Sequence, residues 1–153
     1  MRFAATIAIV LLVGAAAGCG GGKKAATTTT AATPAAQKAE IRQVWERFFA
    51  GTTSASDKEQ LLENGSQFSD ALAAAAKSPF AKQSGARVSS VTLTGPARAK
   101  VVYAILLSGK PVLSHRQGTA VKEDGAWKVG VASFCQLLTL QGGGMPKVCA
   151  NLG

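Results

Sequence analysis

The sequence is poor in the side chains on which metal sites and nucleophilic enzymes depend. Its 153 residues include one histidine and three cysteines. Zinc sites bring together three or four Cys, His or carboxylate ligands, and His115 has no partner at ligand spacing. No serine stands in a G-x-S-x-G pattern, so the nucleophile elbow of hydrolases is absent as well. We therefore expect no metal, no cofactor and no nucleophilic catalysis.

Acidic residues are also scarce and unevenly spread. Asp and Glu number 8 against 17 Lys and Arg, and none occurs between Asp70 and Glu123. The strands predicted for this interval therefore carry no carboxylate that could move a proton. Asp70 and Tyr103, the sole tyrosine, are the remaining acid/base pair. A small-molecule enzyme that uses them is the alternative to a protein without enzymatic activity.

The excess of basic residues persists in the part that is expected to fold. Setting aside Arg2, Lys23 and Lys24 leaves 14 Lys and Arg against 8 Asp and Glu, a net charge of +6 from Gln37 onward. A basic surface attracts anionic partners, so an anionic wall polymer is one candidate. Nucleic acid is argued against, because the basic residues stand singly and Tyr103 is the only tyrosine to interleave with them.

The N-terminus has the organisation of an export signal. Arg2 precedes an apolar stretch over residues 3–17, which has signal-peptide length and is shorter than the about 20 residues of a membrane span. Residues 16–19, AAGC, resemble the lipobox of bacterial lipoproteins, whose cysteine receives a diacylglyceryl group. We predict a lipoprotein signal peptide over residues 1–18 and a lipid on Cys19 that holds the protein at the outer face of the cytoplasmic membrane. The A-x-A pattern of residues 15–17 leaves a soluble secreted protein as the alternative.

Residues 19–36 are interpreted as the lipidated cysteine and a tether. The segment GGGKKAATTTTAATPAA contains no large apolar residue, so it cannot bury enough surface to offset the entropy lost on ordering. We predict that this tether is disordered and that the folded domain spans residues 37–153.

The first half of the folded part is predicted to be helical. Thr33 and Pro34 suit the N-cap and first turn of a helix that runs to Ala50. Shorter helices are expected over residues 56–64 and 67–77. The apolar residues of the first helix recur at helical spacing and share one face: Ile41, Val44, Trp45, Phe48 and Phe49.

From Arg87 the apolar period changes to two, which predicts strands. A slip of the alternation at Ser89-Ser90 predicts a bulge, and the alternation of the third strand places Leu113 and His115 on one face. Three helices followed by a sheet of about four antiparallel strands predict an α+β domain, with the helices packed on one face of a curved sheet. The four strands are expected over residues 87–94, 97–107, 112–121 and 125–135.

Two cysteines remain for the folded domain if Cys19 carries the lipid. In an exported protein, Cys135 and Cys149 most simply form one disulfide. It would close a loop of about 15 residues and contribute up to about 3 kcal/mol. The rival interpretation, a metal pair, lacks further ligands, because His115 is the only histidine.

Six short segments carry a family resemblance: VWERFFAG (44–51), KEQLLENGSQF (58–68), GKPVL (109–113), GAWKV (125–129), FCQL (134–137) and PKVC (146–149). Over residues 37–149 the chain resembles the C-terminal domain of the mycobacterial low-molecular-weight secreted antigen family, found in actinobacterial exported proteins and lipoproteins. The resemblance implies a cone-shaped fold like nuclear transport factor 2, with a long helix in the concavity of a bent sheet. It implies no established activity.

The sequence therefore favours a non-enzymatic binding or interaction module in the cell envelope. The space between the first helix and the sheet is the expected ligand site, with Trp45, Phe48, Tyr103 and Trp127 as candidate pocket residues. We expect an apolar ligand or an envelope protein as partner, beside the membrane that the lipid on Cys19 would reach.

Overall fold

A computed structural model describes residues 32–140 and 147–150. The predictions for the signal peptide, for Cys19 and for most of the tether lie outside the described residues. Contacts within the chain set Ala31–Gly153 apart as a compact unit of its own. The description below concerns this unit.

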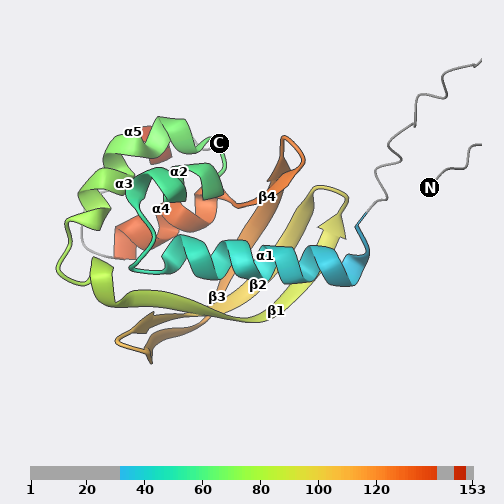
Figure 1. Cartoon of the computed structure of the whole chain (residues 1–153), viewed down its shortest axis with the longest axis horizontal. Helices are drawn as coiled ribbons and strands as arrows, with labels where there is room; N and C mark the ends of the chain where they lie inside the picture. Colours follow the sequence, from blue (N-terminus) through green and yellow to red (C-terminus); the bar gives the residue numbers. More distant parts are fainter. Residues whose placement is uncertain (1–31, 141–146, 151–153) are drawn as a thin grey trace, which may run out of the picture. The chain divides into compact units, whose positions relative to one another are not determined.

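Helices precede and follow a single antiparallel sheet (Figure 1). The strand order is β1-β2-β3-β4, so each strand pairs with its neighbour in sequence. The predicted α+β class with four antiparallel strands is confirmed. In chain order the elements are α1 (Pro34–Phe49), α2 (Ala55–Leu61), the 3-10 helix η1 (Gly65–Phe68), α3 (Ser69–Ala76), the 3-10 helix η2 (Ala81–Gln83), β1 (Ser84–Gly95), β2 (Arg98–Leu107), β3 (Lys110–Glu123), β4 (Ala126–Val129), α4 (Val131–Leu140) and α5 (Lys147–Ala150).

The first helix lies across the strands and supplies much of the core (Figure 1). It begins where the sequence predicts, because the Thr33 hydroxyl accepts a hydrogen bond from the Ala36 N–H at 3.2 Å and Pro34 occupies the first turn. Its start therefore precedes residue 37, the expected first residue of the domain. The side chains of α1 that are buried against the sheet are Ile41, Trp45 and Phe48.

Side chains of α1 also cover the free edge of β1. Arg42 and Glu46 lie one turn apart, and both contact the backbone of Val88. The Val88 N–H donates to Glu46 Oε1 at 3.2 Å, and Arg42 Nη1 donates to the Val88 carbonyl. The predicted bulge lies here, where the β1–β2 register shifts between Val88 and Ser90. Two helix side chains thus satisfy edge groups that would otherwise be open to another strand.

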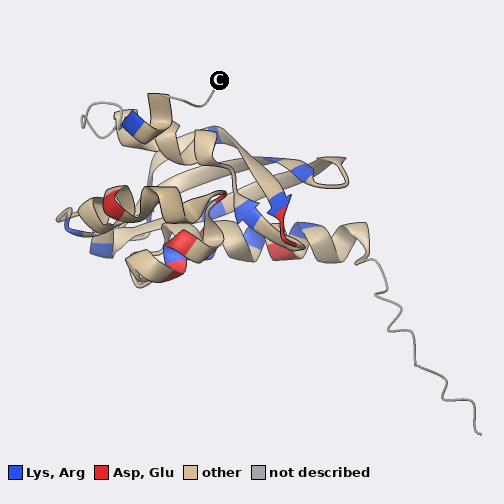
Figure 2. Cartoon of the chain, turned by 90° about the horizontal axis from the view of Figure 1, so that it is seen from above, with Lys and Arg blue, Asp and Glu red and all other residues tan. Residues whose placement is uncertain are grey.

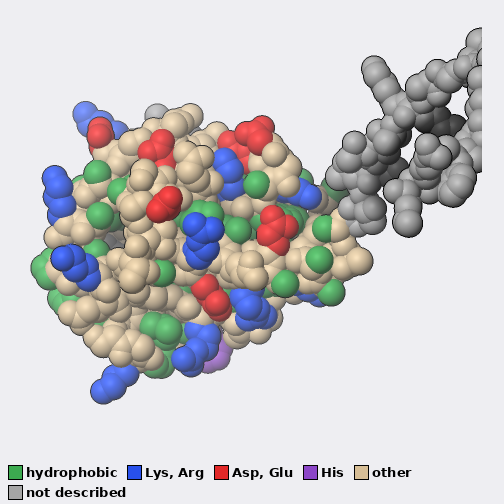
Figure 3. All heavy atoms as spheres, in the orientation of Figure 1, with side chains coloured by type: hydrophobic (Ala, Val, Ile, Leu, Met, Phe, Trp, Pro, Cys, Tyr) green, Lys and Arg blue, Asp and Glu red, His purple; other side chains and the backbone are tan. Residues whose placement is uncertain are grey.

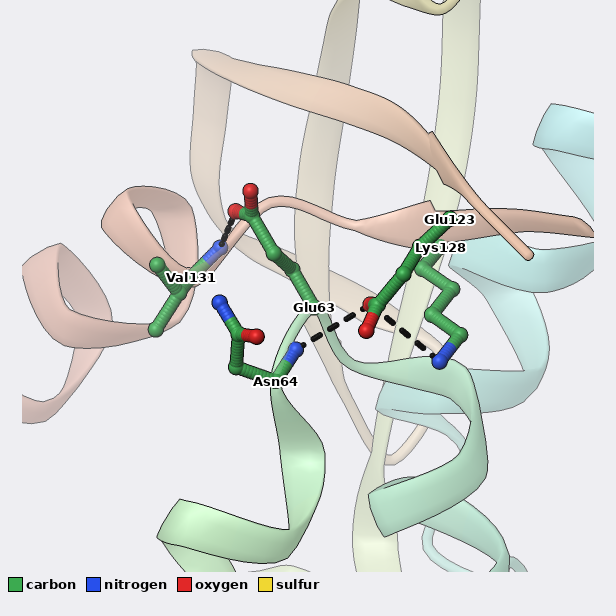
Figure 4. A network of polar contacts seen from close by, with 5 residues as sticks. All are labelled: Glu63, Asn64, Glu123, Lys128 and Val131. Atoms are coloured by element: carbon green, nitrogen blue, oxygen red, sulfur yellow. Dashed lines mark hydrogen bonds and ion pairs between the residues drawn. The ribbon is translucent and has the colours of Figure 1, made fainter.

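The opposite edge of the sheet is covered by the end of α2. Leu62 forms a parallel bridge with Val129, and the Glu63 N–H donates to the Val129 carbonyl at 2.9 Å. The neighbouring Asn64 N–H donates to Glu123 Oε2 at 3.2 Å, and Lys128 pairs with the same oxygen at 3.2 Å (Figure 4). The Asn64 hydrogen bond, with help from Lys128, lowers the pKa of Glu123. This network ties the helical layer to the β3–β4 hairpin.

The fourth strand is shorter than predicted, and the chain continues as α4. The expected strand over residues 125–135 ends at Val129, and Val131–Leu140 is helical. Val131, Phe134 and Cys135 stand at positions i, i+3 and i+4, so a helix buries all three on one face. The Glu63 carboxylate accepts the Val131 N–H at 3.0 Å and so satisfies a free donor at the start of α4 (Figure 4). The predicted strand is therefore wrong beyond Val129, where the chain forms α4.

Gly130, between β4 and α4, allows the chain to pass close to β3. Its N–H donates to the Thr119 carbonyl at 2.7 Å, and a Cβ at residue 130 would lie 2.5 Å from that oxygen. The Ser133 hydroxyl accepts the Thr119 N–H at 2.9 Å. The start of α4 therefore replaces β4 along the edge of β3.

The predicted face of β3 is wrong beyond its middle. One residue of β2 lies between Tyr103 and Ile105, but two residues of β3 lie between their partners Arg116 and Leu113. The extra residue is accommodated around His115, which has φ of 54°. Beyond this bulge Arg116 and Gly118 face α1 in place of the predicted alternation.

The disulfide between Cys135 and Cys149 is confirmed. It joins α4 to α5 across a Cα–Cα distance of 5.8 Å and a sequence separation of 14. Both cysteines are buried. The two helices after the sheet, which the sequence did not predict, are thus held together covalently.

Candidate functional site: an apolar pocket at one end of the sheet

A pocket of about 470 Å³ opens where the helices meet the end of the sheet. Its walls come from the end of α1, from α2, α3 and α4, from the start of β1, and from the β2–β3 hairpin. These elements group at one end of the domain in Figure 1. The volume falls within the range of about 300–1,000 Å³ typical of small-molecule sites. Apart from Phe80 and Val112, the large apolar side chains of its lining are Phe48, Phe49, Leu72, Ile105, Leu106, Leu107, Leu113, Phe134, Leu137 and Leu138.

Small residues keep this space open. Ala75 and Ala76 of α3, Ala81 of η2 and Gly85 of β1 all line the pocket. Their side chains are a methyl group or a hydrogen atom and occupy little of the space. The pocket therefore persists although the surrounding core is packed.

The rim of the pocket exposes unusually large apolar side chains. Phe80 is 63% exposed and Val112 is 55% exposed, and they are the two exposed large hydrophobic residues of the described part of the chain. Both line the pocket. Apolar side chains also reach the surface between Lys and Arg at the corresponding end of the molecule (Figure 3). Exposed apolar side chains gathered at one opening are typical of a binding surface.

Three residues bring polar groups to the lining. The Ser84 hydroxyl lies 3.1 Å from the Phe49 carbonyl oxygen and 2.7 Å from that of Ala81. The Ser78 hydroxyl accepts the Phe80 N–H at 3.4 Å. The third residue is Lys58 of α2, and burial lowers the pKa of its amine. Lys58 is the only charged residue among those that line the pocket.

Of the four residues proposed from sequence to form a pocket, Phe48 lines this one. Trp45 and Trp127 are 0% and 1% exposed and belong to the core. Tyr103 is buried as well, with its ring centroid 5.1 Å from that of Trp45. These three side chains fill the space between α1 and the sheet, and the pocket lies beside it, toward the β2–β3 hairpin.

Asp70 and Tyr103 lie on different parts of the domain. Asp70 is exposed in the first turn of α3, and neither residue lines the pocket. Burial raises the pKa of Tyr103 to about 12, against a smaller lowering by Arg116. The phenol therefore keeps its proton at neutral pH, which removes it as a base there.

Two features of residues 32–140 and 147–150 bear on the kind of site. His, Cys, Asp and Glu side chains form no group of three or more that could hold a metal ion. Helices in the same ranges are all too short or too polar to cross a bilayer.

Two features of the sequence accompany this pocket. The end of β2 is apolar on both faces, at Ile105, Leu106 and Leu107. These three residues line the pocket. The alanine run of α3 is the second feature, since small residues on a helix leave room beside a sheet.

Fold and pocket together define a small α+β domain with an aromatic and aliphatic cavity among its described residues. A comparison with protein-family models matches residues 32–145 to the family "Low molecular weight antigen MTB12, C-terminal domain". The match covers most of the chain, so this protein belongs to that family, as the resemblance in its sequence predicted. The family indicates a secreted or envelope protein of unknown role. Searches of curated proteins and of solved structures gave no significant match.

Proposed function

We propose that this protein is a non-enzymatic exported lipoprotein that binds a small apolar ligand in the pocket between α1, α3, α4 and the sheet. The observation that carries the proposal is the pocket itself. It has about 470 Å³ of space, a predominantly apolar lining and two large exposed apolar side chains at its rim. Such a site gains binding energy from the removal of apolar ligand surface from water, at about 25 cal/mol per Å². A nuclear transport factor 2-like cone is part of the proposal, and the position of α1 across the sheet supports it.

The ligand experiment uses residues 31–153, which form a compact unit, and the neutral fluorescent probe N-phenyl-1-naphthylamine. We expect saturable binding with a blue-shifted emission. In Gly85→Leu the new side chain starts 3.9 Å from Leu106, in ordinary contact, and occupies part of the pocket. This variant should lose most of the binding.

The matched control is Gly95→Leu at the other end of β1. A Cβ at residue 95 meets nothing within 4 Å, so this variant should bind the probe like the original domain. Equal binding by both variants, or no saturable binding by the original domain, would contradict the proposed function.

The proposed anchor places this pocket at the outer face of the cytoplasmic membrane. Its support is the lipobox-like AAGC sequence at residues 16–19. Mass spectrometry of the mature N-terminus tests it: we expect a peptide that begins at Cys19 and carries the mass of a diacylglyceryl group. An unmodified peptide that begins at Gly18 would support the soluble secreted alternative.

A second candidate, binding of an anionic wall polymer, is favoured by the charges of the sheet. Strands β1 and β2 contain no Asp or Glu, and the acidic residues lie on helices, in loops and near the β3–β4 turn (Figure 2). Arg87, Arg98 and Lys100 are exposed and share the sheet face that points away from α1, because Val88, Ala99 and Val101 occupy the buried face. Retention on teichoic acid beads should fall steeply with salt, and salt-independent retention would contradict this candidate.

A further inference from the structure

The pocket contains one charge in an otherwise apolar setting, and this charge belongs to Lys58. The remaining polar side chains of the lining, Ser78 and Ser84, are hydroxyls with backbone partners. Small-molecule sites commonly combine an apolar lining with a few polar groups that orient the ligand. Lys58 is the residue of this pocket that is equipped for that role.

Lys58 lies on the inner face of α2. Ala55 and Leu61, three positions before and after it in α2, pack against the hydrophobic core. Residues at these spacings share one side of a helix. A lysine between Ala55 and Leu61 is unexpected if this face of α2 serves only to pack against the core, because both neighbours on the face are apolar.

The Lys58 amine has no anionic partner in the described part of the chain. The one ion pair found within residues 32–140 and 147–150 joins Glu123 and Lys128. Burial lowers the pKa of Lys58, since partial desolvation disfavours the charged form. A half-buried cation beside apolar walls is stabilised when an anion comes within hydrogen-bond distance.

From this geometry we infer that the ligand is a single-chain anionic amphiphile. Its apolar tail lies against the pocket wall to which Phe48, Leu72 and Phe134 contribute, and its anionic head pairs with the Lys58 ammonium. The inference rests on the proposed function and adds the chemical class of the ligand. A carboxylate and a phosphate head have the same relevant chemistry, a compact anion that accepts hydrogen bonds.

The test measures, by displacement of N-phenyl-1-naphthylamine, the affinities of four ligands with the same tail. These are decanoate, decyl phosphate, decan-1-ol and decyltrimethylammonium, each used below its micelle concentration. We expect decanoate, decyl phosphate or both to bind about tenfold more tightly than the alcohol, as a charge-assisted hydrogen bond provides. The cationic ligand should bind most weakly. Which of the two anions binds better distinguishes a fatty-acid-like ligand from a lipid phosphate.

Three variants assign the effect to the charge. Lys58→Met retains an apolar stem of similar length and should weaken binding of the anions about tenfold while leaving decan-1-ol unchanged. Lys58→Arg keeps the charge and should restore most of the anion affinity. Lys100→Met removes an exposed lysine on the sheet face away from α1 and should change neither. Far-UV circular dichroism verifies that each variant is folded.

Different results would overturn the inference about Lys58 and the proposed function. If decan-1-ol binds as tightly as the anions, or if Lys58→Met leaves the anion affinity unchanged, the pocket binds apolar ligands and the inference about Lys58 is overturned. If the probe and all four ligands fail to bind, the proposed function is overturned together with it. In the anion series from octanoate to decanoate, each added methylene should raise affinity up to about fourfold, the equivalent of about 0.8 kcal/mol.

Discussion

Replacing Gly118 with alanine should destabilise the domain by overpacking the space above Trp45. A Cβ at residue 118 would lie 2.6 Å from Trp45 Cζ2, 2.8 Å from Trp45 Cη2 and 2.9 Å from the Ser133 hydroxyl oxygen. Carbon atoms in good contact are separated by about 3.5–4.0 Å. The indole or the strand must therefore move by nearly an ångström.

Neither neighbour can move freely. Trp45 is 0% exposed, and its ring packs against the rings of Tyr103 and Phe49 at centroid distances of 5.1 and 6.1 Å. Ser133 is buried, and its hydroxyl accepts the Thr119 N–H. Overpacking a core costs about 1–3 kcal/mol, so we expect Gly118→Ala to lower the free energy of unfolding by that amount.

Urea denaturation of residues 31–153, followed by far-UV circular dichroism, measures this cost. Circular dichroism is preferred because Trp45 fluorescence would itself change. Gly95→Ala is the control for the removal of a strand glycine, since its Cβ meets nothing within 4 Å. It should leave stability unchanged or raise it by up to about 1 kcal/mol, through the lower entropy of the unfolded chain.

A double-mutant cycle with Trp45→Phe tests the assigned contact. Phenylalanine lacks the Cζ2 and Cη2 atoms of indole, so Gly118→Ala should cost at least about 1 kcal/mol less in this background, beyond the additivity limit of about 0.5 kcal/mol. Equal costs in both backgrounds would refute the reasoning, because the strain would then not lie between residue 118 and the indole.

Three further predictions concern stability. Replacing Cys135 and Cys149 together with serine should lower the free energy of unfolding by about 3 kcal/mol, and dithiothreitol should destabilise the original domain but not this variant; an equal effect on both would contradict it. Because burial raises the pKa of Tyr103 from 10.0 to about 12, its contribution to stability is complete below pH 10 and declines as pH rises toward 12. Tyr103→Phe should flatten this alkaline loss in thermal melts, and an unchanged slope would count against a buried phenol. The pKa of Glu123 is lowered from 4.5, so the Glu123 carboxylate contributes fully to stability above pH 4.5 and progressively less as pH falls through the lowered pKa. Glu123→Gln should therefore reduce the acid dependence of the melting temperature. An identical acid profile would be inconsistent with the Asn64 hydrogen bond.

Local sequence predicted the elements that depend on local signals. Thr33 and Pro34 fixed the start of α1 because an N-cap and a proline act within one turn. The Asp124-Gly125 pair is a local hairpin signal, because both residues tolerate the positive φ, here 51° and 82°, that a two-residue hairpin turn requires. The disulfide followed from two cysteines in an exported chain. Family membership followed from short segments distributed along the domain.

The boundary between β4 and α4 depended on contacts that are distant in sequence. Trp127, Val129 and Val131 alternate as a strand would, but β3 offers a partner only as far as Ala120, opposite Val129. Beyond it Glu63 and Ser133 supply hydrogen bonds that favour a helix start. No local pattern contains this information.

The sequence by itself determined that this chain carries an export signal pattern, an amphipathic first helix and a strand-rich second half. Each of these depends on the composition of a short segment or on the spacing of its apolar residues. Only the tertiary structure decided where the open space lies. Trp45, Tyr103 and Trp127 were expected around a cavity, yet they fill the centre of the core, since Gly118 lets the indole of Trp45 approach the sheet. The pocket lies beside them, and it depends on the positions of small residues from α3 and β1, which are distant in sequence. The packing of α2 beside these elements brings Lys58 to an apolar cavity, which its place in the sequence does not reveal.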